Sequence, residues 1–445
     1  MGVIQIPEKV HRIIGTLAAA GHEAYAVGGC VRDALLGRKP ADWDITTSAS
    51  PMEVKMLFPR TIDTGIHHGT VTVMIGRDGF EVTTYRVDGE YEDCRHPKEV
   101  QFTKSLIEDL KRRDFTINAM AYNEEHGLVD EFDGVGDLRR GIIRCVGNAG
   151  ERFTEDALRM LRAVRFSAQL DFTLEEHTKA AIGELCGRLQ KVSAERIQAE
   201  LVKLLVSSHP ERIRDAWETG ITRIILPEFD ACMACGQDNP HHIYSVGEHT
   251  IHALQEIDAD KVLRLTVLLH DFGKPAVKTT DERGTDHFHS HQAVSQDLAE
   301  AILKRLKFDN DTIRQVKKLT YYHDYHPALT CAGVRKAMHR IGEELFPLYL
   351  KVQRADILAQ NPVTQERKLA DLAEMERLYK KVLKEQSCFT LKQLAVTGHD
   401  LMDAGIPAGP ELGNILNHLL EAVIEDPQKN ERERLIEQAL EFYKG

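Results

Sequence analysis

The sequence predicts an α+β fold, with a small mixed sheet near the N-terminus and a mostly α-helical chain after it. The runs AYAV, GTVTVMI and FEVTTYR, all between residues 24 and 86, are apolar or alternate with period two, as strands do. Beyond residue 148, apolar residues recur at helical spacing. The length of 445 residues exceeds what one compact core supports, so we expect several domains.

The composition is that of a soluble globular protein, with 42% hydrophobic and 28% charged residues. The start MGVIQIPEKVHRII lacks the pattern of a signal peptide, and no apolar run is long enough to span a membrane, so we expect a cytoplasmic location. Eight scattered cysteines indicate reduced thiols. Because the net charge is −12, a nucleic-acid partner would need a local basic face.

The stretch 24–47, AYAVGGCVRDALLGRKPADWDITT, predicts an active site. A strand, a Gly-Gly turn and a helical turn lead into a second strand, which carries Asp42 and Asp44. Residues two apart share a face of a strand, and two adjacent carboxylates repel each other unless a cation lies between them. The glycine amides and Arg32 can hold a phosphate. A phosphoryl-transfer site with two Mg²⁺ ions explains this combination better than an Asx-rich turn.

The remaining elements of this first domain follow in order. A helix is expected over 7–20, and Ser50 is predicted to cap the next one. GTVTVMI and FEVTTYR are predicted to pair around a turn at 76–79, which places Glu81 beside the strand of the two aspartates as a candidate third carboxylate. The polar stretch 86–103, which contains EDCRHP, is predicted to be a mobile loop.

A single helix is predicted over 105–123, because Arg113, Ile117 and Met120 repeat at three to four residues. If this helix packs behind the sheet, Arg113 can point a guanidinium toward the site. The stretch VDEFDGVGDLRRGIIRCVG is expected to close the domain with turn glycines and a short hairpin, and an entirely helical segment is expected from there to about residue 226.

The next predicted helix, TEDALRMLRAVRF, begins at Thr154 as its N-cap. Asp156 and Arg159 lie three residues apart, so they can present an acceptor and a donor side by side. Cytosine and adenine offer an amino group beside an acceptor, whereas uracil and guanine offer the opposite order. The pair could therefore accept C and A and refuse U and G. A simple salt bridge between the two residues is the alternative.

Basic residues recur along this part of the chain, either as a face for nucleic acid or as solvated helix surfaces. They are Lys111, Arg112, Arg113, Arg139, Arg140, Arg144, Arg152, Arg159, Arg162 and Arg165.

The motif series VGGCVRDALLG, DWDIT, RRDFTINAM, EDALRMLRAVRF and ERIQAEL resembles that of the class II tRNA nucleotidyltransferases, the CCA-adding enzymes, and of their poly(A) polymerase relatives. The resemblance implies a polymerase-beta-like nucleotidyltransferase head over 1–147 and a helical neck and body over 148–226. An HD domain over 227–365 and a tail over 366–445, which contacts tRNA, complete the expected division.

The resemblance also implies roles for individual residues. Asp42 and Asp44 match the catalytic ligands of Mg²⁺. The triphosphate contacts match Gly29, Arg32 and Arg113; the template for the incoming base matches Asp156 and Arg159, with Arg162 and Arg165 as neighbouring contacts. The implied partners are tRNA, CTP and ATP, and no obligatory protein partner is evident.

A further cluster is predicted in the second half. His249, the adjacent His270 and Asp271, and the distant Asp356 resemble the ligand series of the HD metal-dependent phosphohydrolases, and HFHSHQAVS adds His291. Imidazoles with carboxylates suit a divalent transition metal that activates water. By contrast, Cys232-x-x-Cys235 lacks a second such pair, and an ordinary loop is preferred to a zinc site there, although His241 and His242 follow.

Within the family, the activity could be full CCA addition, A-only addition, CC-only addition or poly(A) synthesis. The complete 86–103 stretch disfavours a CC-only enzyme, and the lack of a long basic C-terminal extension disfavours a poly(A) polymerase. A hypothesis from another class makes the HD domain the main activity, as a phosphohydrolase, and leaves the head only to bind nucleotide.

Overall fold

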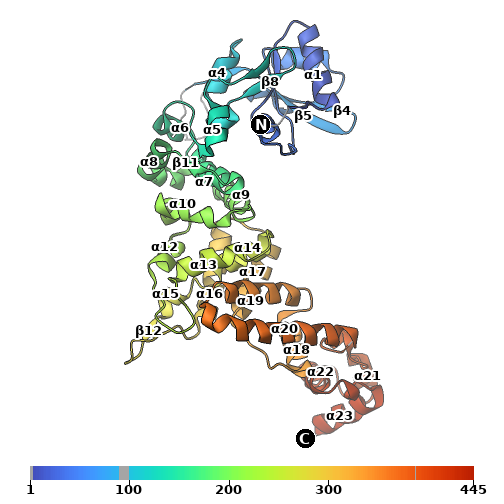
Figure 1. The fold of residues 1–445 in the computed structure, drawn as a ribbon. Helices are drawn as coiled ribbons and strands as arrows, with labels where there is room; N and C mark the ends of the chain where they lie inside the picture. The colour runs from blue at the N-terminus through green and yellow to red at the C-terminus, as the bar shows by residue number, and fades with distance from the viewer. Residues whose placement is uncertain (1–3, 90–99, 386, 445) are drawn as a thin grey trace. The chain divides into compact units, whose positions relative to one another are not determined.

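The computed structural model describes residues 4–89, 100–385 and 387–444, and it divides the chain into two compact units (Figure 1). The first unit is Met1–Pro227 and the second is Glu228–Gly445. The finer division into head, neck and body, HD domain and tail stays a prediction.

The first unit contains a seven-stranded sheet in the order β3-β4-β5-β2-β1-β8-β9. Only β2 and β5 pair in parallel, so the sheet is mixed, as predicted. Its strands are β1 (Ala24–Val27), β2 (Ile45–Thr47), β3 (Thr61–Gly65), β4 (Thr70–Ile75), β5 (Asp78–Thr84), β8 (Ala121–Asn123) and β9 (Gly127–Val129).

Two helices, α1 (Glu8–Ala19) and α3 (Pro51–Leu57), bury apolar faces against this sheet, and Figure 1 shows α1 beside β4 and β5. The core between them includes Val10 of α1 and Val71 of β4, both fully buried. Ser50 caps α3 in a capping box with Glu53, which confirms its predicted role. The predicted β4–β5 hairpin is also present, with Ile75 opposite Asp78.

The stretch 86–103 was expected to be a loop, and this is wrong at its ends. Strands β6 (Arg86–Asp88) and β7 (Val100–Phe102) pair there as an antiparallel ribbon. The EDCRHP motif between them lies outside the described residues.

The single helix expected over 105–123 is also wrong. The chain forms α4 (Leu106–Lys111), a 3₁₀ turn η2 (Thr116–Asn118) and then β8. Asp114 explains the break, because its Oδ1 accepts a hydrogen bond from the backbone N–H of Phe115 at 2.9 Å and so removes that donor from the helix. Phe115 then enters the core, where it is fully buried.

The expected hairpin at the end of the head is replaced by a helix and a parallel pairing. Asp130 accepts hydrogen bonds from the N–H groups of Gly134 and Val135 at 2.7 and 2.9 Å, and this starts α5 (Gly134–Arg140). The following β10 (Ile142–Ile143) pairs in parallel with β11 (Thr173–Leu174), so the segment after it is not entirely helical.

Helices make up most of the remainder of the first unit. They are α6 (Ala149–Glu155), α7 (Leu158–Leu170), α8 (Glu176–Leu185), α9 (Ala194–Leu205), α10 (Ile213–Glu218) and α11 (Ile221–Ile225). The predicted buried stripe of Leu158, Leu161 and Val164 is present on α7. Thr154, however, lies inside α6 and caps nothing, because the expected single helix is divided in two at Asp156.

The second unit is also mostly helical, which confirms the predicted fold class. Its helices are α13 (Val246–Gln255), α14 (Lys261–Leu269), α15 (Lys274–Val277), α16 (His291–Arg305), α17 (Asn310–Tyr322), α18 (Cys331–Ile341), α19 (Phe346–Leu358), α20 (Pro362–Lys384), α21 (Gly398–Asp403), α22 (Pro410–Glu425) and α23 (Arg432–Lys444). A small hairpin, β12 (Thr279–Thr280) and β13 (Asp286–His287), lies between α15 and α16. One core cluster joins α18, α19, α20, α22 and α23.

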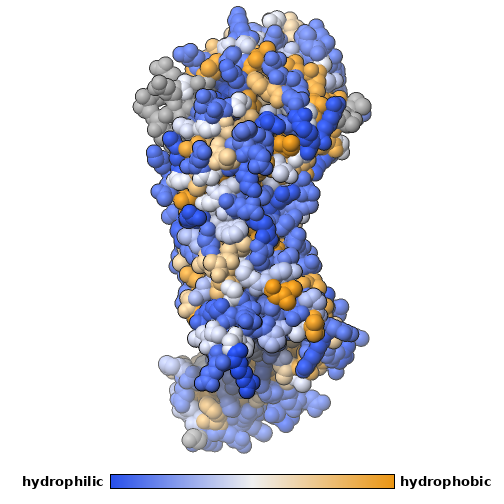
Figure 2. Space-filling model, turned by 60° about the vertical axis from the view of Figure 1, so that its left-hand side comes forward, coloured by the Kyte–Doolittle hydropathy of each residue, from blue (hydrophilic) through white to orange (hydrophobic). Residues whose placement is uncertain are grey.

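Cys232 was expected in a loop, but it lies in the helix α12 (Pro227–Ala234), and Cys235 follows directly after that helix. Both thiols are free and buried, and burial raises the pKa of each. The face drawn in Figure 2 is mostly hydrophilic, with hydrophobic residues scattered over it. No helix in the described ranges is both long and apolar enough to cross a membrane.

Candidate functional sites

Asp42 and Asp44 lie just before β2 and not within it, since that strand begins at Ile45. The backbone still holds Asp44 at the sheet, because its carbonyl accepts a hydrogen bond from the Val27 N–H at 3.0 Å. Loss of solvent around the carboxyl group, together with the negative charges of Asp42 and Glu81, raises the pKa of Asp44 to about 6, while Arg113 acts in the opposite direction. Three carboxylates are therefore close enough to repel one another.

Glu81 reaches this group because β5 pairs with β2 in parallel, with Val82 opposite Ile45. This confirms that the strand of Glu81 neighbours the segment of the two aspartates. A divalent cation would relieve the mutual repulsion of the three carboxylates, and hard oxygen ligands suit Mg²⁺. These residues fit the implied metal.

The turn between β1 and α2 (Gly29–Leu35) brings a guanidinium to the same place. Gly28 has φ +82°, a conformation that favours glycine, and a Cβ there would meet Arg113 Nη1 at 3.1 Å. Arg113 thus lies over the turn while it acts electrostatically on Asp44. The structure brings Arg113 to the site although the predicted long helix does not exist.

Arg32 is buried on α2 beside this turn, with Nη2 3.7 Å from where a Cβ on Gly29 would lie. Its guanidinium donates hydrogen bonds to Asn118 Oδ1 and Asp33 Oδ1, each at 2.8 Å. Asn118 was not predicted as a site residue, although it lies in the RRDFTINAM motif. Its role is to fix the direction of a side chain that is expected to contact phosphate.

Asp156 occupies the break between α6 and α7. Its Oδ1 accepts a hydrogen bond from the Leu158 N–H at 3.0 Å, and its Oδ2 accepts one from Arg196 Nη2 at 2.7 Å. Arg159 instead pairs with Glu155, Nη1 to Oε2 at 2.5 Å. The simple salt bridge between Asp156 and Arg159 is therefore absent, and each of the two residues is held by a different neighbour.

Arg162 and Arg165 lie further along α7, and each pairs with a carboxylate of the same unit. Arg162 donates to Asp114 Oδ2 at 2.5 Å, and Arg165 Nε lies 2.8 Å from Glu200 Oε2. Burial lowers the pKa of the Arg165 guanidinium to about 10. Burial alone would raise the pKa of Asp114, but the charge and hydrogen bonds of Arg162 outweigh it and lower that pKa.

Phe166 is a residue that sequence reasoning missed. Three guanidinium groups surround its ring, with the carbons of Arg165, Arg32 and Arg162 at 3.8, 5.1 and 5.4 Å from the ring centre. The ring therefore joins a triphosphate candidate on α2 to the arginines of α7. The helical stripe pattern indicates only a core position for Phe166, because the sequence does not show that α2 packs there.

The four predicted ligands of the second half do converge. His249 Nε2 lies 2.8 Å from Asp356 Oδ1, and His270 Nε2 lies 3.2 Å from Asp271 Oδ2. The Nε2 atoms of the two histidines are 3.3 Å apart. His249 comes from α13, His270 and Asp271 follow α14, and Asp356 lies on α19.

A second trio shares Asp271. His291 and His323 have their Nε2 atoms 3.1 Å apart, and these lie 3.4 and 3.5 Å from Asp271 Oδ1. The two trios, His249–His270–Asp271 and Asp271–His291–His323, both have the spacing of metal ligands. All five of these residues are buried. His323 was not predicted, although Asp324 follows it in a second His-Asp pair, because only the fold brings it near the cluster.

The orientation of the four imidazoles suits a cation. Each Nδ1 atom faces a backbone carbonyl, at 3.2 Å for His249, 2.6 Å for His270, 2.9 Å for His291 and 2.6 Å for His323. A carbonyl oxygen only accepts, so each Nδ1 donates to its carbonyl, and each Nε2 is the ring nitrogen that faces the cluster. Nε2 atoms that lie 3.1–3.3 Å apart can act together as ligands of a cation.

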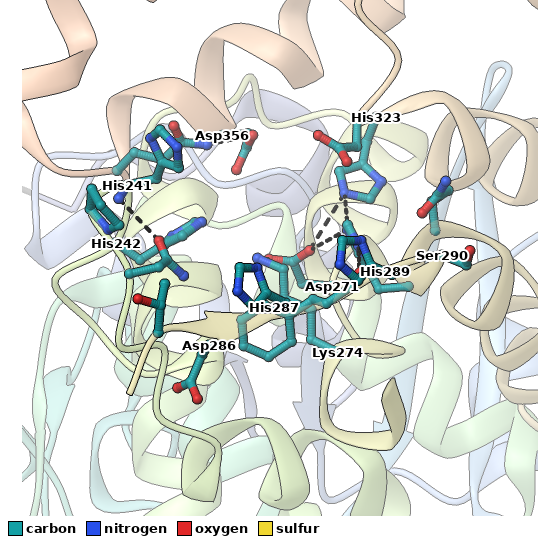
Figure 3. Close-up of a pocket in the computed structure, with 18 residues that line it drawn as sticks. His241, His242, Asp271, Lys274, Asp286, His287, His289, Ser290, His323 and Asp356 are labelled. Carbon is teal, nitrogen blue, oxygen red and sulfur yellow. Dashed lines mark hydrogen bonds and ion pairs between the residues drawn. The ribbon is translucent and has the colours of Figure 1, made fainter. Parts of the chain in front are cut away.

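Asp271 supports the same conclusion. Both of its carboxylate oxygens are buried without a hydrogen bond of good geometry, although Lys274 Nζ lies 2.7 Å from Oδ2. A cavity of about 500 Å³ opens over the cluster, and Figure 3 shows Asp271, His323 and Asp356 on its wall. The residues present fit a divalent metal, and substrate could enter from the cavity.

Three family models match the chain. The poly A polymerase head domain matches residues 24–144, the RNA and SrmB-binding site of polymerase A matches 171–233, and tRNA nucleotidyltransferase domain 2 matches 287–439.

Curated relatives match over nearly the whole length. The CCA-adding enzyme of Levilactobacillus brevis is 37% identical over 432 residues, 96% of each chain. That of Lactiplantibacillus plantarum is 37% identical and covers 96% of this chain and 94% of its own. Among solved structures, the Bacillus stearothermophilus CCA-adding enzyme in complex with CTP aligns with a TM-score of 0.74 and 30% identity, covering 99% of this chain and 98% of its own.

Proposed function

The chain belongs to the CCA-adding enzymes, and we propose that its first unit completes the 3′ ends of tRNA with CMP, CMP and AMP, taken from CTP and ATP. The observation that carries this function is full-length similarity to such enzymes, at 37% identity over 96% of both chains. The same unit contains the carboxylate cluster, the Gly-Gly turn and the arginines that nucleotidyl transfer needs.

The reaction is an attack by the terminal ribose 3′-OH of tRNA on the α-phosphorus of CTP or ATP. A P–O bond forms to the ribose oxygen as the bond to pyrophosphate breaks, and the hydroxyl proton passes to solvent. Enzymes of this class depend on a divalent metal, and we propose Mg²⁺, held by Asp42 and Asp44 with Glu81 as a third carboxylate. When bound, Mg²⁺ would activate the hydroxyl and neutralise the leaving pyrophosphate.

The triphosphate is bound by Gly29, Arg32 and Arg113 in this proposal. Arg32 is supported by its hydrogen bond to Asn118, which fixes the guanidinium before the nucleotide arrives. Arg113 is supported by its contact with the turn at Gly28 and its electrostatic action on Asp44. Positive charge is thus directed to the place where negative charge develops.

The incoming base is selected by Asp156 and Arg159, with Arg162 and Arg165 beside them. Asp156 accepts the amino hydrogen of cytosine or adenine, and Arg159 donates to the neighbouring ring nitrogen. The hydrogen bond from Arg196 supports this role, because it fixes the direction of the Asp156 carboxylate. Uracil and guanine would leave both protein groups without partners.

Two tRNA substrates test the function. A tRNA that ends at the discriminator base should gain C, C and A when CTP and ATP are both present, and only two C residues with CTP alone. A tRNA that ends in CC should gain one A from ATP. Extension of the second tRNA only would indicate A-only addition, and a long A tract would indicate a poly(A) polymerase.

A second activity is supported in the other unit by the Nδ1–carbonyl contacts of the four histidines. We propose that His249, His270, Asp271 and Asp356 hold a divalent transition metal, and that His291 and His323 complete the cluster. When bound, the metal would ionise a water molecule near neutral pH. Hydrolysis there would join a water oxygen to the phosphorus of a phosphate ester, break the P–O bond to the alcohol and leave a proton on the alcohol oxygen.

Hydrolysis of phosphomonoesters and 2′,3′-cyclic phosphates tests this second activity, with Mg²⁺, Mn²⁺, Co²⁺ or Ni²⁺ added in turn. Activity with at least one transition ion is expected, and inactivity with all four would leave the cluster a structural role only.

We also propose a cytoplasmic location, where tRNA is matured. The seven cysteines in the described part of the chain are all free, which is typical of proteins in reducing compartments.

A further inference from the structure

The cavity over the metal cluster continues into a second space that the proposed hydrolysis does not use. We call the first the metal lobe and the second the side lobe. The side lobe has a volume of about 590 Å³, and both lobes are lined by His241, His242, Asp324, Asp356 and Gln360. A volume in this range accommodates an organic ligand group, so the two lobes form one site with two compartments.

The side lobe combines an apolar wall with two cations. Its apolar residues include Leu329, Val363 and Met375, and Val363 is 88% exposed at the start of α20. Arg367 and Lys368 are on the same helix and also line the lobe. An apolar surface next to two cations fits an organic group that carries negative charge.

Lys368 is connected to the metal lobe by a chain of hydrogen bonds. Its Nζ donates to Gln360 Oε1, and Gln360 Nε2 donates to Asp356 Oδ2 at 2.9 Å. Asp356 in turn lies at the cluster, 2.8 Å from His249 Nε2. Gln360 thus stands between the side-lobe cation and a candidate metal ligand, and it fixes their separation.

Three carboxylates also line the side lobe: Asp324, Asp356 and Asp371. Asp324 lies 3.5 Å from His326 Nε2, Asp356 faces the cluster, and Asp371 makes no ion pair with Arg367 or Lys368 in the described part of the chain. Among the side chains that the structure describes, Arg367 makes no ion pair and no hydrogen bond. Its charge is available to a ligand.

We propose that the side lobe binds the alcohol part of the phosphate ester that the metal cluster hydrolyses, and that this alcohol is bulky and carries a second anionic group. A nucleoside bisphosphate has this chemistry: one phosphate at the metals, the nucleoside against the apolar wall and the second phosphate at Arg367 and Lys368. The inference rests on the proposed hydrolase and adds its substrate class.

The test compares phenyl phosphate with adenosine 3′,5′-bisphosphate as substrates of the full chain with Mn²⁺. Arg367→Gln and Lys368→Gln together should raise KM for the bisphosphate about tenfold more than KM for phenyl phosphate, and this ratio separates the side lobe from any change at Asp356 through Gln360. Lys380→Gln, an exposed position on α20 outside both lobes, is the matched control and should change neither substrate. Equal KM values in the wild type and the double variant would overturn the inference and leave the hydrolase standing.

A binding measurement tests the side lobe even if the protein hydrolyses no ester. If no ester is cleaved with any of the four ions, the hydrolase proposal fails, and calorimetry with adenosine 3′,5′-bisphosphate tests the side lobe separately. Nucleotide binding in the head is common to all variants, so only the side lobe can produce a difference. Weaker binding by about tenfold in the double variant alone would support the side lobe, and identical binding would overturn it.

Discussion

Asp44, Arg113 and Gly28 meet at one turn of the head, although they come from three separate segments. Burial of its carboxyl group and the negative charges of Asp42 and Glu81 raise the pKa of Asp44 to about 6. Residue types and spacing placed the two aspartates and Arg113 in one candidate site, although neither the strand β2 nor the helix α4 extends over them as expected. They were not enough for Asn118, Phe166 or Arg196, whose roles depend on which segments the fold brings together.

Substitutions at the base-selecting residues should reduce base selection without abolishing nucleotidyl transfer. Asp156→Ala or Arg159→Ala removes one of the two groups that face the base, so misincorporation of UTP and GTP should rise by about 10- to 100-fold, the equivalent of one buried unpaired group. Rates of incorporation, measured with one nucleoside triphosphate present at a time, test this. Arg223→Ala, an exposed arginine on α11, is the control. Unchanged selectivity in both variants would refute the template role.

Asp114 offers a test by pH. Its lowered pKa means that the pairing with Arg162 stabilises the fold above about pH 4 and is lost as the pH falls toward the folded-state pKa. Asp114→Asn should therefore lower the free energy of unfolding by about 2 kcal/mol at pH 7, and this difference should shrink below pH 4.

Urea unfolding from pH 7 to pH 2 measures the effect of Asp114→Asn. Asp63→Asn removes an exposed pair with Lys55 and should change little at any pH, because exposed pairs contribute about 0–1 kcal/mol. A difference between wild type and Asp114→Asn that stays constant with pH would contradict the pairing.

At the scale of elements, periodicity predicted well wherever one face of a helix is buried. Helices α1 and α3 and the β4–β5 hairpin are where their patterns indicate. The failures occur where a side chain takes over a backbone hydrogen bond. Asp114 ends the predicted helix over 105–123, and Asp156 divides the helix predicted from Thr154. Helical periodicity does not detect these hydrogen bonds, because they involve single polar residues.

Substitution of two glycines that both have positive φ tests the role of the β1–α2 turn. Gly28 and Gly37 have φ of +82° and +71°, but only a Cβ at Gly28 would approach Arg113. Both Gly→Ala variants should lose about 1 kcal/mol of stability from backbone strain. Gly28→Ala should also lower kcat/KM for CTP and ATP at least tenfold, whereas Gly37→Ala should not. Equal activity in both would show that the turn does not position Arg113.

At the scale of the molecule, the two units each contain a group of candidate metal ligands. The carboxylates of Asp42, Asp44 and Glu81 form the one in the first unit, which suits Mg²⁺. Imidazoles dominate the one in the second unit, which suits a transition ion. Chain order identified five of the second group, including His291, but His323 and the side lobe depend on the packing of α17, α19 and α20, which sequence patterns do not specify.

The two activities should be separable. His270→Ala removes a ligand of the second group and should abolish phosphate ester hydrolysis, while CMP and AMP addition stays within about twofold of the wild type. Parallel assays of both reactions on one preparation measure this. Loss of nucleotide addition in a His270→Ala protein that unfolds at the wild-type temperature would mean that the two units are coupled.

Single-turnover extension of a tRNA that ends at the discriminator base tests the central claim most directly, with Asp42→Ala and Asp44→Ala beside the wild type. Each variant removes a carboxylate from the surface of the cluster and no apolar contact from the core, so the unfolding temperature should be unchanged. Addition of both CMP and AMP should fall at least about 1,000-fold, because charge stabilisation at the reacting phosphate is lost. Wild-type rates in either variant would contradict the assignment of nucleotidyl transfer to this site.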